Sequence, residues 1–343
     1  MNESVFLLPT PLPLESGEAL PGARVAYRTW GQLNATRSNV VWVCHALTAN
    51  ADVLDWWPGL FGEGCFFDPA DWFIVCANVL GSCYGSTSPL DVDPTTGRGR
   101  YKDFPLLTIR DLVAAHEALR QELGLAHIHT LIGGSLGGQQ ALEWAASQPD
   151  IASHLVVIAT SARHSAWGIA FNEAQRLAIE ADATYHENRP DGGATGLAAA
   201  RAVALLSYRG YEAYANTQTE PTNDVLRDFR ASSYQRYQGA KLVARFNAYS
   251  YVVLTRVMDS HNLGRGRGGV AAALAGIRAR TLVLGITSDV LFPLSEQREI
   301  AAGIPGAVYG ELDSSFGHDG FLLETVKITQ ALEAFYAAEL ASH

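Results

Sequence analysis

The sequence predicts an α/β protein with a mostly parallel central sheet, flanking helices and an inserted helical lid. Continuous apolar runs, typical of strands buried on both faces of a parallel sheet, alternate with amphipathic helical patterns. This alternation stops after Thr160 and resumes only at Thr281, much farther along than the roughly 30 residues of one β-α-β unit. We therefore expect a core built from residues 1–160 and 275–343, with a helical lid formed by residues 161–274. Two separate domains would also fit the chain length.

The first part of the chain alternates strand and helix signals in a regular order. Thr108 with Asp111 makes a plausible capping start for the first long helix, and Gly124 follows its end. The right-handed crossover rule folds such a series into a parallel sheet. The expected strands are residues 23–30, 39–44, 72–79, 129–132 and 154–159, and the expected helices are 108–123 and 138–147.

The lid is predicted from helical stretches at residues 166–183 and 197–208 and from its many tyrosines. The Gly-rich segment 264–269 returns the chain to the core, although Arg265 and Arg267 within it could instead contact an anionic ligand. The core then finishes with a strand at 281–286, a helix at 295–302, a strand at 308–312 and a helix at 322–339.

Composition excludes several partners. The formal net charge is -10, and no run of Lys or Arg forms a basic stripe for a phosphate backbone, so we expect no nucleic acid partner. No apolar run reaches the roughly 20 residues that cross a bilayer, and the amino terminus lacks a signal-peptide pattern, so we expect no membrane partner and a cytoplasmic location. Four scattered cysteines predict reduced thiols, and the lack of a Cys/His cluster or a phosphate loop predicts no metal and no bound nucleotide cofactor.

The segment Gly133-Gly134-Ser135-Leu136-Gly137-Gly138 satisfies the G-x-S-x-G pattern. An apolar strand ends just before it and a helical pattern follows, which is the context of a nucleophile elbow. The alternative is a Gly-rich nucleotide-binding turn, which usually comes early in its fold and has an acidic residue about 20 positions later, whereas here Asp150 lies nearest that position. The pattern favours Ser135 as a nucleophile in an α/β-hydrolase fold.

A serine nucleophile needs a base and an orienting carboxylate, which follow it in this fold in the order Ser, acid, His. Asp289 lies just beyond the 281–286 strand, and His318 lies in the turn after the last short strand. Asp313 is the competing carboxylate. Other histidines are expected in solvated or capping roles; they are His116, His127, His129 and His186.

The tetrahedral intermediate of acyl transfer needs two amide donors. The sequence predicts that Leu136, directly after the nucleophile, and Leu47, in the loop after an earlier strand, supply them. His45 is expected to brace this loop.

Several motifs together resemble the homoserine O-acetyltransferase family: Cys44-His45-Ala46-Leu47-Thr48, residues 78–87 (NVLGSCYGST), the elbow with Ala141-Leu142-Glu143-Trp144, Leu206-Ser207-Tyr208-Arg209 and Gly317-His318-Asp319. The resemblance covers almost the whole chain. It implies a ping-pong reaction in which Ser135 takes an acetyl group from the co-substrate acetyl-CoA and passes it to the hydroxyl of L-homoserine, on the route to methionine. It also implies that Arg209 grips the substrate carboxylate, that Asp319 meets its ammonium group, and that the protein forms a homodimer through the lid helices.

The chain departs from the family's common pattern at two places. It has Leu136 where Met is common, and Ala49-Asn50 where Gly follows Leu-Thr. Because residues 47–50 lie near the acyl group, a succinyl donor stays open as an alternative. L-Serine as the acceptor is a second alternative with the same mechanism. An esterase or thioesterase, in which water resolves the acyl-enzyme, is the alternative from another reaction class.

Overall fold

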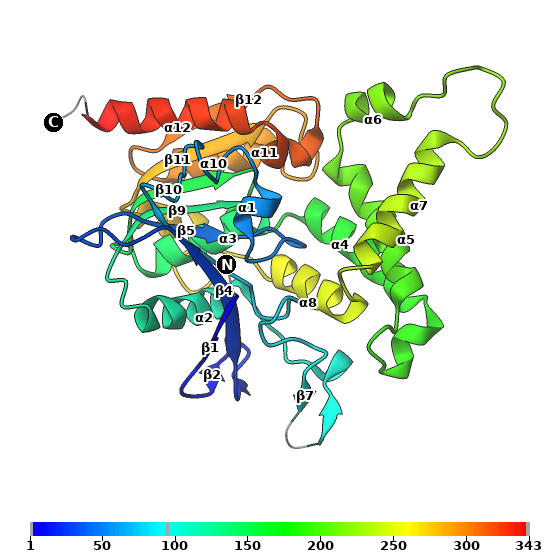
Figure 1. Ribbon diagram of the computed structural model, residues 1–343, viewed down its shortest axis with the longest axis horizontal. Helices are drawn as coiled ribbons and strands as arrows, with labels where there is room; N and C mark the ends of the chain where they lie inside the picture. Colours follow the sequence, from blue (N-terminus) through cyan, green and yellow to red (C-terminus); the bar gives the residue numbers. More distant parts are fainter. Residues whose placement is uncertain (1–2, 94–95, 341–343) are drawn as a thin grey trace.

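The computed structural model describes residues 3–93 and 96–340. Its centre is an eight-stranded sheet in the order β1-β4-β6-β5-β9-β10-β11-β12 (Figure 1). The β1–β4 and β4–β6 pairs are antiparallel and the other neighbouring pairs are parallel, which confirms the prediction of a mostly parallel sheet. The strands are β1 (Ser4–Leu7), β4 (Arg24–Trp30), β5 (Val40–Cys44), β6 (Phe73–Ala77), β9 (Ile128–Gly134), β10 (Ala152–Ile158), β11 (Arg280–Ile286) and β12 (Val308–Leu312).

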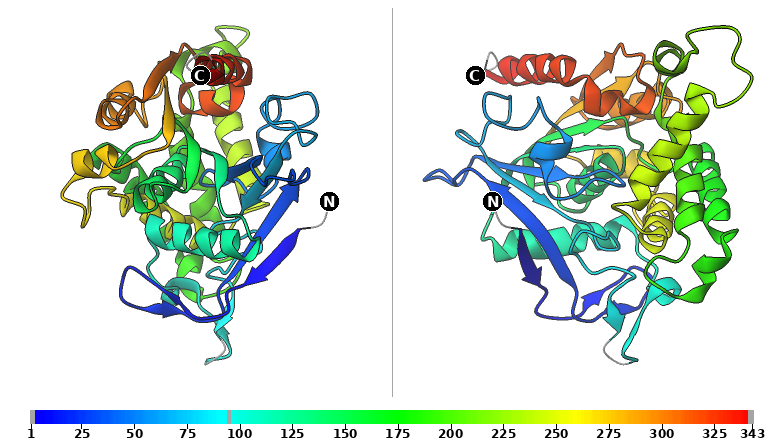
Figure 2. Two further views of the ribbon diagram at one scale, coloured as in Figure 1. Left: turned by 90° about the vertical axis from the view of Figure 1, so that its left-hand side faces the viewer. Right: turned by 45° about the vertical axis from the view of Figure 1, so that its right-hand side comes forward.

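Alternate residues of the central strands pack into two separate cores, one on each face of the sheet. Trp42 points into one core, whereas Val41 and Val43 point into the other. The first core is covered by α2 (Ile109–Glu122), α3 (Leu136–Ser147) and α10 (Leu294–Gly303), and the second by α1 (Val53–Trp56), α11 (Gly320–Leu323) and α12 (Thr325–Leu340) (Figures 1 and 2). Because both faces are covered, the strand sequences are nearly continuous in apolar residues.

The predicted cap of α2 is confirmed, because the Asp111 carboxylate accepts from the Thr108 amide at 2.8 Å and the Thr108 side chain accepts from the Asp111 amide. Two other helices differ from prediction. α3 begins at Leu136, two residues before the expected start, because the elbow passes directly into the helix. The last helix is interrupted at Glu324, whose ψ of 41° separates α11 from α12.

Helices α4 to α8 form the lid, which lies on one side of the sheet core (Figure 1). Asp259 joins α8 to α4, because it pairs with Arg176 of α4 at 2.6 Å and accepts from Asn172 of α4 at 2.8 Å. The predicted division of the chain at residues 160 and 274 stays a prediction. The lid helices are α4 (Ala166–Glu180), α5 (Ala194–Tyr208), α6 (Tyr211–Gln218), α7 (Arg230–Val243) and α8 (Ala248–Asp259), and α9 (Val270–Ala275) leads back to β11.

The Gly-rich segment 264–269 is a turn that connects the lid to α9. Gly266, Gly268 and Gly269 have positive φ. Arg265 binds Glu15 at 2.8 Å, and Arg267 donates to Glu143 at 2.9 Å. Both arginines are therefore satisfied by carboxylates of the chain itself, which favours the turn over an anion-binding role.

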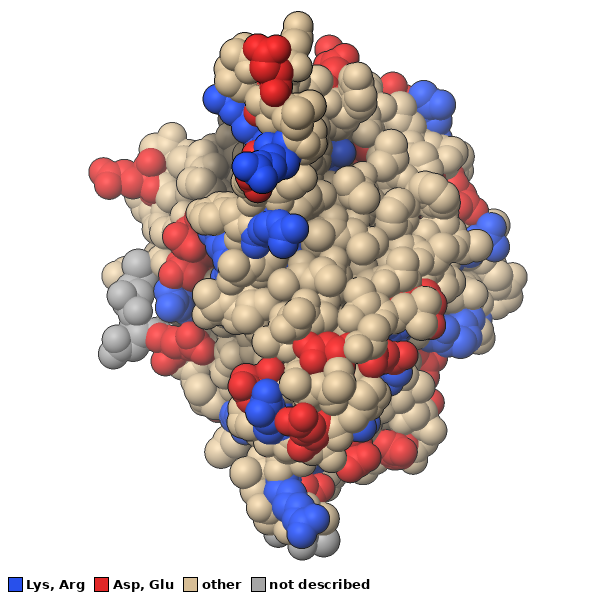
Figure 3. Space-filling model, turned by 90° about the vertical axis from the view of Figure 1, so that its right-hand side faces the viewer, with Lys and Arg blue, Asp and Glu red and all other residues tan. Residues whose placement is uncertain are grey.

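The face that includes the lid carries basic and acidic side chains interspersed among uncharged ones, with a broad uncharged area near its centre (Figure 3). Nothing on this face resembles a continuous basic stripe. Within residues 3–93 and 96–340, the helices are too short or too polar to cross a membrane.

His116 contradicts its predicted solvated or capping role. Its side chain is 1% exposed on α2, with its ring 6.0 Å from that of Trp42 and 6.3 Å from that of Trp144. Neither ring nitrogen has a hydrogen-bond partner in the described part of the chain. Its helical spacing with Leu112 and Leu119 signals a core position, and here the spacing was the better guide than the polarity of the residue.

Candidate active site

Ser135 stands on a strained turn between β9 and α3. Its backbone has φ 57° and ψ -125°, a conformation that costs about 1–3 kcal/mol in a non-glycine residue. Its amide donates to Ile158 O at 3.0 Å, and its carbonyl accepts from the Thr160 hydroxyl at 2.8 Å. Side chains at the neighbouring glycines would not fit, because a Cβ at Gly137 would overlap the Cys44 carbonyl. The G-x-S-x-G pattern thus forms the predicted elbow.

The structure brings Ser135, His318 and Asp289 together in one continuous chain of contacts. His318 Nε2 lies 2.9 Å from Ser135 Oγ, and His318 Nδ1 lies 2.7 Å from Asp289 Oδ2. All three residues are at most 5% exposed. Because an ionised carboxylate only accepts, Nδ1 donates to Asp289 and Nε2 is left to accept the serine proton. This is the arrangement of a nucleophile, a base and an orienting acid.

Asp289 is itself held in place by the backbone of its own loop. Its Oδ1 accepts from the amides of Leu291 at 2.8 Å and Phe292 at 2.9 Å, which leaves Oδ2 directed at His318. The competing carboxylate, Asp313, instead accepts from the Thr287 hydroxyl at 3.4 Å. Geometry therefore favours Asp289 as the partner of His318.

The charge of Asp289 acts on the basicity of His318. Burial disfavours the imidazolium, but the charge and hydrogen bond of Asp289, with a smaller contribution from Asp319, outweigh it and raise the pKa of His318 above 6.5. The raised pKa makes His318 a stronger base for taking a proton from a hydroxyl whenever the ring is neutral.

Within the described residues, the amides of Leu47 and Leu136 have no backbone acceptor. Leu136 is the first residue of α3, where an amide has no partner within the helix. Leu47 lies in a turn closed by the Ala49 amide, which donates to Ala46 O at 3.0 Å. Free amides at these positions are what an oxyanion hole requires.

His45 braces this turn, as expected. Its Nε2 accepts from the Val79 amide at 3.0 Å, so the proton lies on Nδ1, which donates to Ala46 O at 2.8 Å. The side chain is fully buried, and burial lowers the pKa of His45 to about 4. A neutral histidine is therefore fixed between two loops of the core.

A cavity of about 620 Å³ opens above Ser135 between the core and the lid. Arg209, at the end of α5, pairs with Asp319 at 2.9 Å, and Asp319 follows His318 directly in the chain. The structure thus places both predicted substrate-binding residues in the wall of the cavity that contains Ser135 and His318. The cavity's charged lining residues are Arg201, Arg209, Lys241, Arg245, Asp55 and Asp319.

Comparison with known proteins agrees with this geometry. Residues 39–325 match the family model described as the alpha/beta hydrolase fold. A relative from Cyclobacterium marinum, named homoserine O-acetyltransferase, is 48% identical over 336 residues, which cover 98% of this chain and 95% of the relative. The chain belongs to the homoserine O-acetyltransferase family. The resemblance predicted from the motifs is confirmed.

Solved structures place the same fold in both transferases and hydrolases. The homoserine O-acetyltransferase of Staphylococcus aureus superposes with a TM-score of 0.80 at 32% identity, covering 98% of this chain and 95% of that one. Esterase E22 superposes with a TM-score of 0.88 at 22% identity, covering 97% of this chain and 99% of that one. At that identity the likeness to the esterase shows the fold alone.

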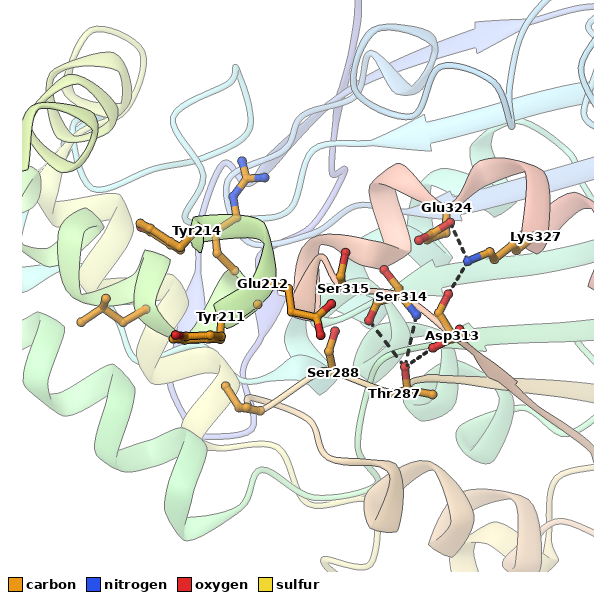
Figure 4. Close-up of a pocket in the computed structure, with 14 residues that line it drawn as sticks. Tyr211, Glu212, Tyr214, Thr287, Ser288, Asp313, Ser314, Ser315, Glu324 and Lys327 are labelled. Carbon is orange, nitrogen blue, oxygen red and sulfur yellow. Dashed lines mark hydrogen bonds and ion pairs between the residues drawn. The ribbon is translucent and has the colours of Figure 1, made fainter. Parts of the chain in front are cut away.

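A second and larger cavity, of about 920 Å³, is lined by Ser288 and Val290 on either side of Asp289 and by residues 313–315 before His318 (Figure 4). Ser288 and Ser315 line it, and the Thr287 hydroxyl there contacts Asp313 and Ser314. Ser135 does not line this cavity, so its size does not make it the site of acyl transfer. Arg209 lines both cavities and forms part of the wall between them.

Sequence reasoning missed two residues of the site. Thr160 supports the carbonyl of Ser135, and Arg245 reaches the Leu47 loop from the lid. Thr160 carried a weak signal, because it follows a core strand at the carboxyl edge of the sheet where the elbow also lies. Arg245 carried none, since it lies 197 residues from its partner Thr48 in a helical insertion.

Proposed function

We propose that this chain transfers an acetyl group from acetyl-CoA to the hydroxyl of L-homoserine through an acyl-enzyme on Ser135. The observation that carries the proposal is the unbroken Asp289–His318–Ser135 contact chain at the floor of a lid-covered cavity. Membership of the homoserine O-acetyltransferase family supports the choice of substrates.

In the first half-reaction, Ser135 Oγ attacks the thioester carbonyl while His318 Nε2 takes the hydroxyl proton. The amides of Leu47 and Leu136 donate to the oxyanion of the tetrahedral intermediate. His318 then returns the proton to the departing sulfur, and CoA leaves as the thiol. Asp289 stabilises the imidazolium formed between these two proton transfers and keeps the ring oriented.

In the second half-reaction, the homoserine hydroxyl attacks the acetyl-serine. His318 takes its proton and returns it to Ser135 Oγ as the new ester forms. Arg209 and Asp319 suit an amino acid, because a guanidinium fork matches a carboxylate and a carboxylate attracts an ammonium group. In the free protein Arg209 and Asp319 pair with each other. An amino acid can take over both contacts, because its carboxylate can replace Asp319 beside Arg209 and its ammonium group can replace Arg209 beside Asp319.

Transfer instead of hydrolysis requires that the acceptor hydroxyl is held near the acyl group and that water is excluded. Arg209 of the lid lines the cavity and can hold the acceptor near the acyl group. The lid also covers Ser135, which is only 5% exposed, and this limits the access of water. The triad alone does not distinguish the two outcomes, because both proceed through the same acyl-enzyme.

Mass spectrometry of the intact protein after mixing with acetyl-CoA alone tests the first step. We expect one added acetyl group, mapped to Ser135 and lost after L-homoserine is added. Unmodified wild-type protein, or an equal modification of Ser135→Ala, would refute the acyl-serine mechanism.

CoA release tests the substrates. We expect release to depend on L-homoserine and to be slower with L-serine or with succinyl-CoA. Faster release with either replacement would reassign the acceptor or the donor. Steady release without an acceptor would indicate a thioesterase.

We also propose that the protein is a homodimer assembled through the lid. Large apolar side chains are exposed on the lid, and burial against a second copy would remove them from water. The most exposed are Leu226, Tyr211, Leu206, Tyr237 and Leu177. Light scattering of the purified protein, and of a Leu206→Glu, Tyr237→Glu double variant, measures the molar mass; a monomeric wild type would refute this part.

A further inference from the structure

The turn that carries the Leu47 amide is held mainly by donors from the core. Gln140 of α3 donates to His45 O at 3.2 Å. His45 Nδ1 and the Ala49 amide both donate to Ala46 O. Each of these contacts fixes one carbonyl of the turn and so restricts the direction of the peptide groups around Leu47.

The carbonyl of Thr48 is different, because its donor comes from the lid. Arg245, two residues beyond the end of α7, donates through Nη1 to Thr48 O at 2.5 Å and to the Tyr84 hydroxyl at 2.6 Å. Its Nη2 donates to Thr48 Oγ1 at 3.3 Å. No carboxylate in the described part of the chain forms an ion pair with Arg245. The guanidinium therefore donates to the turn and to Tyr84 and not to a carboxylate.

The segment that carries Arg245 is itself anchored to the body of the protein. The side chains of Leu242 and Phe246, on either side of it, are 1% and 5% exposed. The Phe246 ring packs edge-on against Tyr84 at 5.7 Å between centroids. Lid, turn and the Tyr84 loop thus meet at one guanidinium group.

We propose that Arg245 is a positioning residue that sets the direction of the Leu47 amide, so that the oxyanion hole is complete only when the lid is in place. Thr48 follows Leu47 directly in the turn closed by the Ala49 amide. Fixing the Thr48 carbonyl therefore restricts the orientation of the Leu47 amide in the same turn. The inference rests on the proposed acyl-serine chemistry and adds that the lid assists the chemical step as well as substrate binding.

Arg245 also lines the substrate cavity, and a cation there could instead bind an anionic part of the acyl donor. A small neutral ester separates the two roles. p-Nitrophenyl acetate carries no phosphate, so the burst of nitrophenolate that accompanies acylation of Ser135 depends on the triad and the oxyanion hole but not on donor phosphates.

The test compares the burst rate of the full-length wild type with that of Arg245→Met. Loss of the positioning contact should slow the burst about 10- to 100-fold, which is less than the roughly 10²–10³ lost when an oxyanion donor is removed outright. Arg245→Lys should recover part of the rate, because an ammonium group donates to the carbonyl but cannot form the fork. Arg236→Met, which removes an exposed cation from α7 of the same lid, is the matched control and should keep the wild-type burst.

Arg245 is exposed, so Arg245→Met creates no buried cavity, and an unchanged melting temperature would show that the fold is intact. A wild-type burst rate for Arg245→Met, with a raised KM for acetyl-CoA alone, would overturn the inference in favour of donor binding. The acyl-serine chemistry itself is tested separately on the wild type, where the absence of acetyl-serine would refute it whatever Arg245→Met does.

Discussion

Asp289→Asn should almost abolish acyl transfer without disturbing the fold. The Asp289 Oδ1 atom is fixed by the Leu291 and Phe292 amides, so an asparagine would keep its carbonyl oxygen there and place its NH₂ group where Oδ2 meets His318 Nδ1 at 2.7 Å. That NH₂ group can only donate, which forces the His318 proton onto Nε2. The ring would then face Ser135 Oγ, 2.9 Å away, with a proton and could not act as a base.

The size of the effect follows from losing both the tautomer and the stabilised imidazolium. We expect kcat to fall about 10⁴-fold, as for the equivalent change in other triads, which corresponds to about 5.5 kcal/mol of barrier. The burst with p-nitrophenyl acetate and CoA release with homoserine should both fall, while the melting temperature stays close to that of the wild type. Asp313→Asn is the matched control. Retention of more than a tenth of the activity by Asp289→Asn, or an equal loss in Asp313→Asn, would refute the assignment.

Three further outcomes are expected. Because the base must be neutral and the pKa of His318 is raised, the acylation rate should be lost as pH falls through a midpoint above 6.5; a midpoint below that value in a burst-rate profile would contradict the electrostatic argument. Arg209→Gln should raise the KM for homoserine about 10- to 100-fold, with a smaller effect on the rate of Ser135 acetylation, and equal losses in both half-reactions would argue against acceptor binding. Gly137→Ala should lower the free energy of unfolding by roughly 3 kcal/mol, because its Cβ overlaps the Cys44 carbonyl; a wild-type denaturation midpoint would show that the elbow can relax.

The sequence was sufficient to predict the sheet and the meeting of Ser135, Asp289 and His318, because both follow from local pattern and chain order. β5 is apolar throughout, β9 and β10 become apolar toward their carboxyl ends, and the elbow marks the end of β9. Once Ser135 is placed, the fold leaves few loops from which an acid and a histidine can reach it. Asp289 and His318 lie after β11 and β12, at the edge of the sheet where the elbow also lies.

Contacts between the lid and the core could not be predicted in the same way. Arg245 and Thr48 are 197 residues apart, and no periodicity relates them. The partner of Arg265, Glu15, is equally remote. Such pairings depend on how a helical insertion docks, and that is decided by tertiary packing and not by local propensity. The same limit explains His116, whose burial depends on two tryptophans from other elements.

The histidines of this chain show what separates a base from a structural residue. Burial lowers the pKa of four of them to about 3 or 4: His45, His116, His164 and His261. An imidazole of that basicity is too weak to take a proton from a serine hydroxyl near neutral pH. His318 is as deeply buried, yet its pKa is raised, because Asp289 offsets the cost of desolvating its charge. Asp289 therefore supplies basicity as well as orientation, and its replacement by asparagine should move the pKa of His318 toward the low values of the other buried histidines.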